Sequence, residues 1–246
     1  GALLFLAFDI SRLRPTKDID FMGTAVNNDI EEMKLIFREI VTIEAPDGLE
    51  FDPESISLEY IKEDDKYNGL RVIVTSRLGT VKQNLQVDIG FGDVISNGPI
   101  EINYPGILNF PEPVILAYSI ESAIAEKFEA IVSLGFTTSR MKDFYDILFF
   151  ANSHSFNSEN LLQAIKLTFS NRGTDLGERS LILKDSFKTD KNKQLQWTAF
   201  TNKNKLETEK TFETAVDKIQ SFIEPLFAMN SRHYWNPELR EWQSLD

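Results

Sequence analysis

Asp18-Ile19-Asp20-Phe21-Met22 is the stretch of sequence that decides the fold. Polar and apolar residues alternate along it, which is typical of a short β-strand. Successive side chains of a strand point to opposite faces, so Asp18 and Asp20 share one face and Ile19 and Phe21 share the other. The Cβ atoms of the two aspartates then lie about 6–7 Å apart. This spacing would let both carboxylates bind one metal cluster.

A second stretch, Leu85-Gln86-Val87-Asp88-Ile89, repeats the same alternation. Leu85, Val87 and Ile89 are expected to face the core, and Asp88 points the other way. If the two strands are neighbours, three carboxylates converge on one face, where divalent cations would offset their mutual repulsion. Alternating aspartates are also common on the solvent face of an antiparallel sheet, so the spacing alone leaves a plain surface role open.

A helix is predicted over residues 120–134, with Ser119 as its N-cap and Gly135 as its C-terminal stop. Lys127 falls in the middle of the apolar stripe of this helix, where a lysine is rarely found unless its ammonium group has a partner. The partner could be a triphosphate or an active-site carboxylate. Alternatively, the stem packs on the stripe while the charge reaches water at its edge.

The next predicted helix, at 140–151, carries acidic residues near its start. Asp143 shares a face with Ile147 and Phe150, so its carboxylate needs a cationic or hydrogen-bonding partner. Asp143 and Asp146 could equally serve only to stabilise the positive end of the helix dipole.

The rest of the first half predicts a small α+β domain. A helix is expected to end at about Glu39, with Asn27 or Asn28 as its N-cap. Three β-rich stretches predict a meander in which Asn68-Gly69 forms one turn. These stretches are 56–61, 70–76 and 85–91.

The second half predicts helices. Prolines make the segment from 99 to 113 irregular. Beyond it, helical patterns occupy 120–134, 140–151, 158–170 and 207–228. A boundary therefore falls near 115–119, which divides the chain into an α+β core at 1–118 and a helical C-terminal region at 119–246.

Composition restricts the chemistry. The 246 residues contain no Cys, which excludes disulfides and thiol nucleophiles, and two His, which disfavours a His-rich zinc site. Metal chemistry would therefore use carboxylates, the ligands that favour Mg²⁺ or Mn²⁺. We expect a cytoplasmic protein without membrane association, because no segment has the length of a membrane span and no signal peptide is recognisable.

The net charge of −12 argues against a protein that coats nucleic acid non-specifically. A local basic groove remains possible, because Arg12, Arg14 and Lys17 cluster just before the first aspartate. A second basic set lies in the C-terminal half and is interpreted as solvated loop charge, with an RNA contact as the alternative. Its members are Lys184, Lys188, Lys191 and Lys193.

Several motifs follow one another in an order that resembles AbiEii/AbiGii-type toxins, members of the DNA polymerase β-like nucleotidyltransferase superfamily. After Gly1 and an apolar helix they are Arg14-Pro-Thr-Lys-Asp18-Ile-Asp20-Phe, Val87-Asp88-Ile-Gly, Ala125-Glu-Lys127-Phe-Glu-Ala and Arg140-Met-Lys-Asp143-Phe-Tyr-Asp146. The resemblance covers about residues 1–150. It implies a mixed sheet with helices that holds the carboxylates, followed by a helical C-terminal region that completes the active site.

The family resemblance also implies a function. Such proteins transfer nucleoside monophosphate from an NTP to an acceptor, in several members the 3′ end of tRNA, and act as the toxin of a toxin–antitoxin pair. A cognate antitoxin protein is then a possible partner. By motif, Asp18 and Asp20 would bind Mg²⁺ (or Mn²⁺) with Asp88 as the third carboxylate. Lys127 would meet the triphosphate, and Asp143 would lie near the active site.

Gly1 and Arg14 are the remaining residues that the resemblance implicates. The family opens its site with Gly-Gly or Gly-Ser, whose backbone amides hold phosphate at a helix N-terminus. Here Gly1 is followed by Ala2, so either the sequence begins inside this motif or the phosphate cradle is incomplete. Arg14 is expected to contact phosphate or the acceptor.

Two other functions are compatible with these residues. One is an enzyme of the same fold that modifies a small molecule or a protein, which would need a tight pocket in place of a basic groove. The other is a catalytically inactive relative that acts as a binding partner. That protein would lack a metal ligand, whereas all the aspartates are present here.

Overall fold

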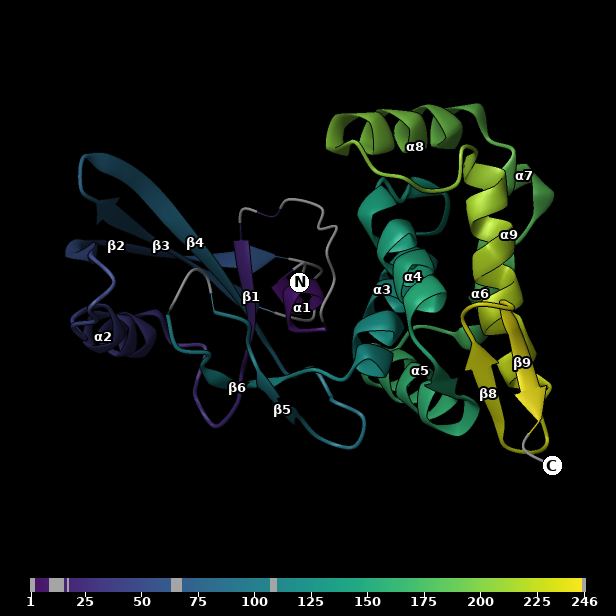
Figure 1. Cartoon of the computed structure of the whole chain (residues 1–246), viewed down its shortest axis with the longest axis horizontal. Helices are drawn as coiled ribbons and strands as arrows, with labels where there is room; N and C mark the ends of the chain where they lie inside the picture. The colour runs from purple at the N-terminus through teal and green to yellow at the C-terminus, as the bar shows by residue number, and fades with distance from the viewer. Residues whose placement is uncertain (1–2, 9–15, 17, 63–67, 107–109, 245–246) are drawn as a thin grey trace. The chain divides into compact units, whose positions relative to one another are not determined.

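The computed structural model describes residues 3–8, 16, 18–62, 68–106 and 110–244. They form two compact units (Figure 1). The sheet unit comprises residues 1–93 and 102–115, and the helical unit comprises 94–101 and 116–246. In the part of the chain that is described, none of the helices has the length and apolar character needed to span a lipid bilayer.

A four-stranded mixed sheet forms the centre of the sheet unit, with the strand order β1-β4-β3-β2. The strands are β1 (Asp18–Gly23), β2 (Leu49–Lys62), β3 (Asn68–Leu78) and β4 (Val81–Phe91). The last three form the predicted antiparallel meander, and β1 runs parallel to β4 at the edge of the sheet. The strands expected at 56–61, 70–76 and 85–91 are therefore confirmed, although each is longer than its sequence pattern indicated.

The turn predicted at Asn68-Gly69 is wrong. These residues begin β3, and Gly69 pairs with Ile61 of β2. Gly69 is explained by close packing instead, because a Cβ atom at this position would lie 3.1 Å from the carbonyl oxygen of Ile89. β3 and β4 are joined by the two-residue turn Gly79-Thr80, in which Gly79 adopts a φ of +58° that glycine tolerates without strain.

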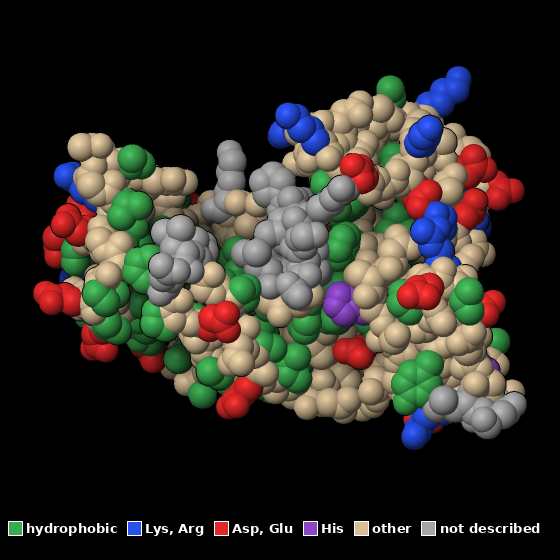
Figure 2. Space-filling view, viewed as in Figure 1, with side chains coloured by type: hydrophobic (Ala, Val, Ile, Leu, Met, Phe, Trp, Pro, Cys, Tyr) green, Lys and Arg blue, Asp and Glu red, His purple; other side chains and the backbone are tan. Residues whose placement is uncertain are grey.

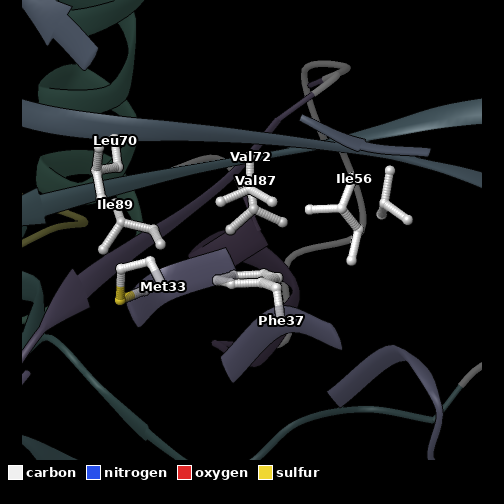
Figure 3. Close-up of a cluster of buried hydrophobic side chains, with 8 residues drawn as sticks. Met33, Phe37, Ile56, Leu70, Val72, Val87 and Ile89 are labelled. Atoms are coloured by element: carbon white, nitrogen blue, oxygen red, sulfur yellow. The ribbon is translucent and has the colours of Figure 1, made fainter. Parts of the chain in front are cut away.

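Helix α2 (Ile30–Val41) covers one face of the sheet. Met33 and Phe37 of this helix pack against Leu70, Val72 and Val87 to form a buried core (Figure 3). Because successive side chains of a strand point to opposite faces, the residues next to these core residues in the sequence emerge on the opposite face of the sheet. The burial of one face thus determines which side chains the other face displays.

The N-cap of α2 is Asp29, so the prediction of Asn27 or Asn28 is wrong. The Asp29 carboxylate accepts a hydrogen bond of 2.9 Å from the backbone N–H of Glu32. An aspartate satisfies an orphan N–H group and also places negative charge at the positive end of the helix dipole. Among its described residues, the sheet unit also contains α1 (Leu3–Ala7), in the apolar segment expected to be a helix or a strand.

Helices dominate the helical unit. The longer ones are α3 (Ile120–Leu134), α4 (Met141–Ser153), α5 (Ser158–Arg172), α8 (Lys191–Asn204) and α9 (Phe212–Ile223). Short helices α6 (Arg179–Ile182) and α7 (Asp185–Lys188) and a small sheet of β7 (Phe156–Asn157), β8 (His233–Asn236) and β9 (Glu241–Ser244) complete it. Ser119 and Gly135 cap α3 as predicted.

Three parts of this half differ from the sequence prediction. Residues predicted to be irregular include β5 (Ile100–Asn103), which pairs with β6 (Val114–Ala117). The helix expected at 207–228 begins only at Phe212, after the N-cap Thr211. Helix α8 is absent from the sequence prediction, which interprets Lys191 and Lys193 as loop charge. Only Lys193 and Trp197 of this helix are buried, so its sequence shows no apolar stripe.

Candidate active site

The pairing of β1 with β4 brings the three predicted aspartates together. In the parallel register Asp20 is the direct partner of Asp88, and Asp18 lies two residues before Asp20 on the same face. One carboxylate oxygen from each of the three lies within 4.8 Å of the others. Asp20 is exposed, whereas Asp18 and Asp88 are partly buried. The group could hold a metal ion.

The core behind this face keeps the aspartates in position. Val87 and Ile89, which flank Asp88, are buried against α2, and Ile19 packs partly on the same core. Phe21 lies in the same phase but is 56% exposed, because β1 is the edge strand of the sheet. The alternation predicted from the sequence therefore orients the aspartates, and β4 anchors them more firmly than β1 does.

Arg71 and Gln86 also contact this cluster, and the sequence interpretation missed both. Arg71 of β3 is the register partner of Asp88 and donates from Nε and Nη2 to its two carboxylate oxygens, each at 2.8 Å. The Gln86 side-chain amide lies 3.2 Å and 3.1 Å from the same two oxygens. The hydrogen bonds with Asp88 raise the pKa of Arg71 above its usual value.

A polar contact also fixes the first aspartate. The Thr16 hydroxyl donates a 2.5 Å hydrogen bond to the Asp18 carboxylate. Gly1, Arg12, Arg14 and Lys17, which the sequence implicates in phosphate or acceptor binding, lie outside the described residues.

A second charged cluster joins α3 to α4 within the helical unit. The Lys127 ammonium lies 2.7 Å from Asp146 and 3.4 Å from Asp143. The Nε–H group of Arg140 donates to Asp143 at 2.5 Å. Both aspartate side chains are buried, at 1% exposure or less, and that of Lys127 is 14% exposed. The expectation that Lys127 and Asp143 need charged partners is confirmed, and Asp146, which could have been a mere dipole residue, is the closer partner of the lysine.

The second basic set is not a run of solvated loop charge. Lys188 is buried and donates to Asp217 at 2.7 Å and to Gln220 at 2.5 Å. Lys193 is buried as well, donates to the Thr138 carbonyl oxygen, and has its pKa lowered by burial. The idea that these two lysines contact RNA is therefore wrong, because their ammonium groups are used in packing. Lys184 and Lys191 remain exposed.

Comparison with known proteins assigns the class. The mixed sheet with its cluster of aspartates belongs to a nucleotidyltransferase, since residues 1–218 match the sequence model described as "Nucleotidyl transferase AbiEii toxin, Type IV TA system". The chain belongs to this AbiEii toxin family. The match extends over most of both units. No curated protein sequence matches the chain.

Two crystal structures from Helicobacter pylori are similar. One is JHP933, at 18% identity and a TM-score of 0.45, covering 93% of this chain and 84% of that one. The other is described as a candidate nucleotidyltransferase, at 19% identity and a TM-score of 0.44, covering 92% of this chain and 86% of that one. At these scores neither structure adds weight to the family match.

Proposed function

We propose that this protein transfers nucleoside monophosphate from an NTP to an acceptor hydroxyl, with a divalent cation held by Asp18, Asp20 and Asp88. The observation that carries the proposal is the approach of three carboxylates within 4.8 Å on paired strands of an AbiEii family member. The acceptor hydroxyl would release its proton to water, and its oxygen would form a bond to the α-phosphorus. The bond from that phosphorus to the bridging oxygen would break, and pyrophosphate would leave.

The residues fit Mg²⁺ or Mn²⁺. Carboxylate oxygens are the ligands that these hard cations prefer, and the described residues offer no thiolate or imidazole to this cluster. Three carboxylates so close together repel one another, so a cation between them would be favourable. When bound, such a cation would neutralise phosphate charge and lower the pKa of the attacking hydroxyl.

We further propose that Lys127 binds the triphosphate and that Asp143 of α4 holds the Lys127 side chain in place. Asp143 and Asp146 hold the lysine ammonium group within a largely apolar helix pair, which supports a positioning role. The family match over residues 1–218 supports the idea that the helical unit completes the active site. Gly1 and Arg14 would contribute to phosphate or acceptor binding.

The proposed acceptor is the 3′ end of tRNA, and the protein would act as the toxin of a toxin–antitoxin pair with a cognate antitoxin. Family membership supports the toxin role and a nucleotide substrate. Lysine side chains lie at both ends of α8 (Figure 2), which offers local positive charge in a chain of net charge −12. The burial of Lys188 and Lys193 reduces this basic surface, so a small-molecule or protein acceptor is the competing assignment.

The test is a transfer assay with each labelled NTP, Mg²⁺ and total tRNA. Wild-type protein should label RNA with at least one NTP, and the Asp20→Asn variant should not. Glu50→Gln, which removes an exposed carboxylate from β2 of the same sheet, is the matched control and should behave as wild type. Label on no RNA but on a small molecule or protein would reject the tRNA acceptor. Equal transfer by the Asp20→Asn variant would reject the metal site itself.

A further inference from the structure

Four charged residues form a row across the sheet. The register pairs Asp20 of β1 with Asp88 of β4, Asp88 with Arg71 of β3, and Arg71 with Glu59 of β2. Directly paired residues share one face of a sheet, so all four side chains emerge on the side away from α2. Arg71 is the one cation of this row, and its Nη1 atom lies 3.9 Å from the Glu59 carboxylate.

The carboxylate of Asp88 already accepts hydrogen bonds from two side chains. An ionised carboxylate has about four lone-pair sites on its two oxygens. Arg71 engages both oxygens with its fork, and the Gln86 amide approaches both from the same strand. A divalent cation would compete with these donors for the same two oxygens, so their presence opposes its binding to Asp88.

Arg71 is the donor whose withdrawal matters most. Its guanidinium brings a full positive charge to the position where cation binding would add more, whereas Gln86 is neutral. The Arg71 side chain is 32% exposed, so its guanidinium group can move toward water and keep its charge solvated. Gln86 stays beside Asp88 on β4 and can keep the carboxylate oriented after Arg71 has moved.

We infer that Arg71 competes with the divalent cation for Asp88 and thereby sets the affinity of the metal centre. Asp18 and Asp20, on one strand, form the permanent part of the centre, and Asp88 is the exchangeable ligand. Arg71 is thus a positioning residue, and it acts on the metal through Asp88. Coupling between two ligands of one group is reciprocal, so cation binding weakens the Arg71–Asp88 pair as much as that pair weakens cation binding. This inference rests on the proposed metal-dependent function.

The first experiment measures Mn²⁺ binding to the full chain by isothermal titration calorimetry. Arg71→Gln removes the charge, and Arg71→Lys keeps the charge without the fork. Arg77→Gln is the matched control, because Arg77 lies on the same strand and in the same phase but pairs with Lys82. We expect Arg71→Gln to bind Mn²⁺ about tenfold more tightly than wild type. Arg77→Gln should match wild type, and adding Asp88→Asn to Arg71→Gln should abolish the gain.

The outcomes separate this inference from the proposed function. Mn²⁺ binding to wild type that Arg71→Gln does not tighten overturns the competition and leaves the metal centre intact. An equal gain in Arg77→Gln also overturns it, because net charge would then explain the effect. If no variant binds Mn²⁺, both the competition and the proposed metal centre fall.

A second measurement needs no destabilising substitution. The Nε–H resonance of Arg71 in ¹⁵N NMR spectra, assigned by its loss in Arg71→Lys, reports whether the fork remains on Asp88. Saturation of the wild-type protein with Mg²⁺ should shift this resonance, and the Asp20→Asn variant should show no shift at the same concentration. An unchanged Arg71 resonance in the saturated wild-type protein would overturn the competition.

Discussion

The ammonium group of Lys127 lies 2.7 Å from the carboxylate of Asp146, whose side chain is fully buried between α3 and α4. A carboxylate in this environment is stable as an anion only while its cation is present. Lys127 therefore supports the packing of the helix pair, whatever else it does. Replacement of Lys127 should therefore affect the stability of the fold as well as activity.

Replacing Lys127 with Met should abolish nucleotidyl transfer and also destabilise the protein. Removal of one partner of a buried ion pair leaves an uncompensated charge and costs about 3–5 kcal/mol of unfolding free energy. Urea denaturation followed by circular dichroism measures this loss. An unfolding free energy equal to that of wild type would show that the pair contributes little.

The double variant Lys127→Met/Asp146→Asn separates folding from chemistry. Neutralising Asp146 removes the uncompensated charge, so much of the lost unfolding free energy should return. Transfer should stay absent if Lys127 binds the triphosphate. Recovery of transfer in the refolded double variant would limit Lys127 to a structural role.

Replacing Asp20 with Asn should lower kcat for transfer on the order of a thousandfold, as the loss of an electrostatic group of a catalytic site does. The melting temperature should hold or rise, because one of three mutually repelling carboxylates becomes neutral. Differential scanning calorimetry and a single-turnover assay give the two quantities. A fall in melting temperature comparable to that of a core variant would mean that the cluster is structural.

Mg²⁺ should stabilise the folded protein without any nucleotide. A ligand that binds only the native state raises the unfolding free energy by about 2.7 kcal/mol at a hundred times its Kd. Thermal melts across a Mg²⁺ series should therefore shift upward for wild type and for Glu50→Gln. Asp18→Asn should lose this shift, and a shift of wild-type size in that variant would remove Asp18 from the metal centre.

If tRNA is the acceptor, the logarithm of its association constant should fall linearly with the logarithm of salt concentration. Replacing Arg12 and Lys17 with Ser should impair transfer to tRNA more than binding of NTP. Replacing exposed Lys184 and Lys191 with Ser tests the C-terminal contact, with exposed Lys210→Ser as the control. Filter binding at several salt concentrations measures the effect. Affinity that ignores salt and all of these substitutions would reject an RNA acceptor.

The aspartate cluster could be predicted because strand periodicity is local. Asp88 sits between Val87 and Ile89, which are buried, and Asp18 and Asp20 flank Ile19, which packs partly on the same core. The aspartates are therefore left on the opposite face of the sheet. Arg71 could not be found in this way. In sequence it is an arginine on the polar phase of a strand, which usually means solvent, and its pairing with Asp88 depends on the register that the turn at Gly79 sets.

The same limit explains the errors in the helical half. The lysines of α7 and α8 look solvated in sequence, yet Lys193 bonds to Thr138, which lies far away along the chain. Trp197 is the buried apolar residue of α8, and its indole N–H reaches the carbonyl oxygen of Glu209. A single anchor of this kind produces no periodic pattern, so such a helix is visible only after the tertiary packing is known.

The parallel pairing of β1 with β4 has a consequence for the order in which the chain folds. β2, β3 and β4 meet their neighbours through short connections, whereas β1 must wait for a strand that is synthesised much later. Closing that long loop costs more chain entropy than closing the short connections of the β2-β3-β4 meander does. A nascent chain that has not yet released β4 from the ribosome therefore carries Asp18 and Asp20 without Asp88. The aspartate cluster therefore cannot assemble before β4, which ends at Phe91, has been released.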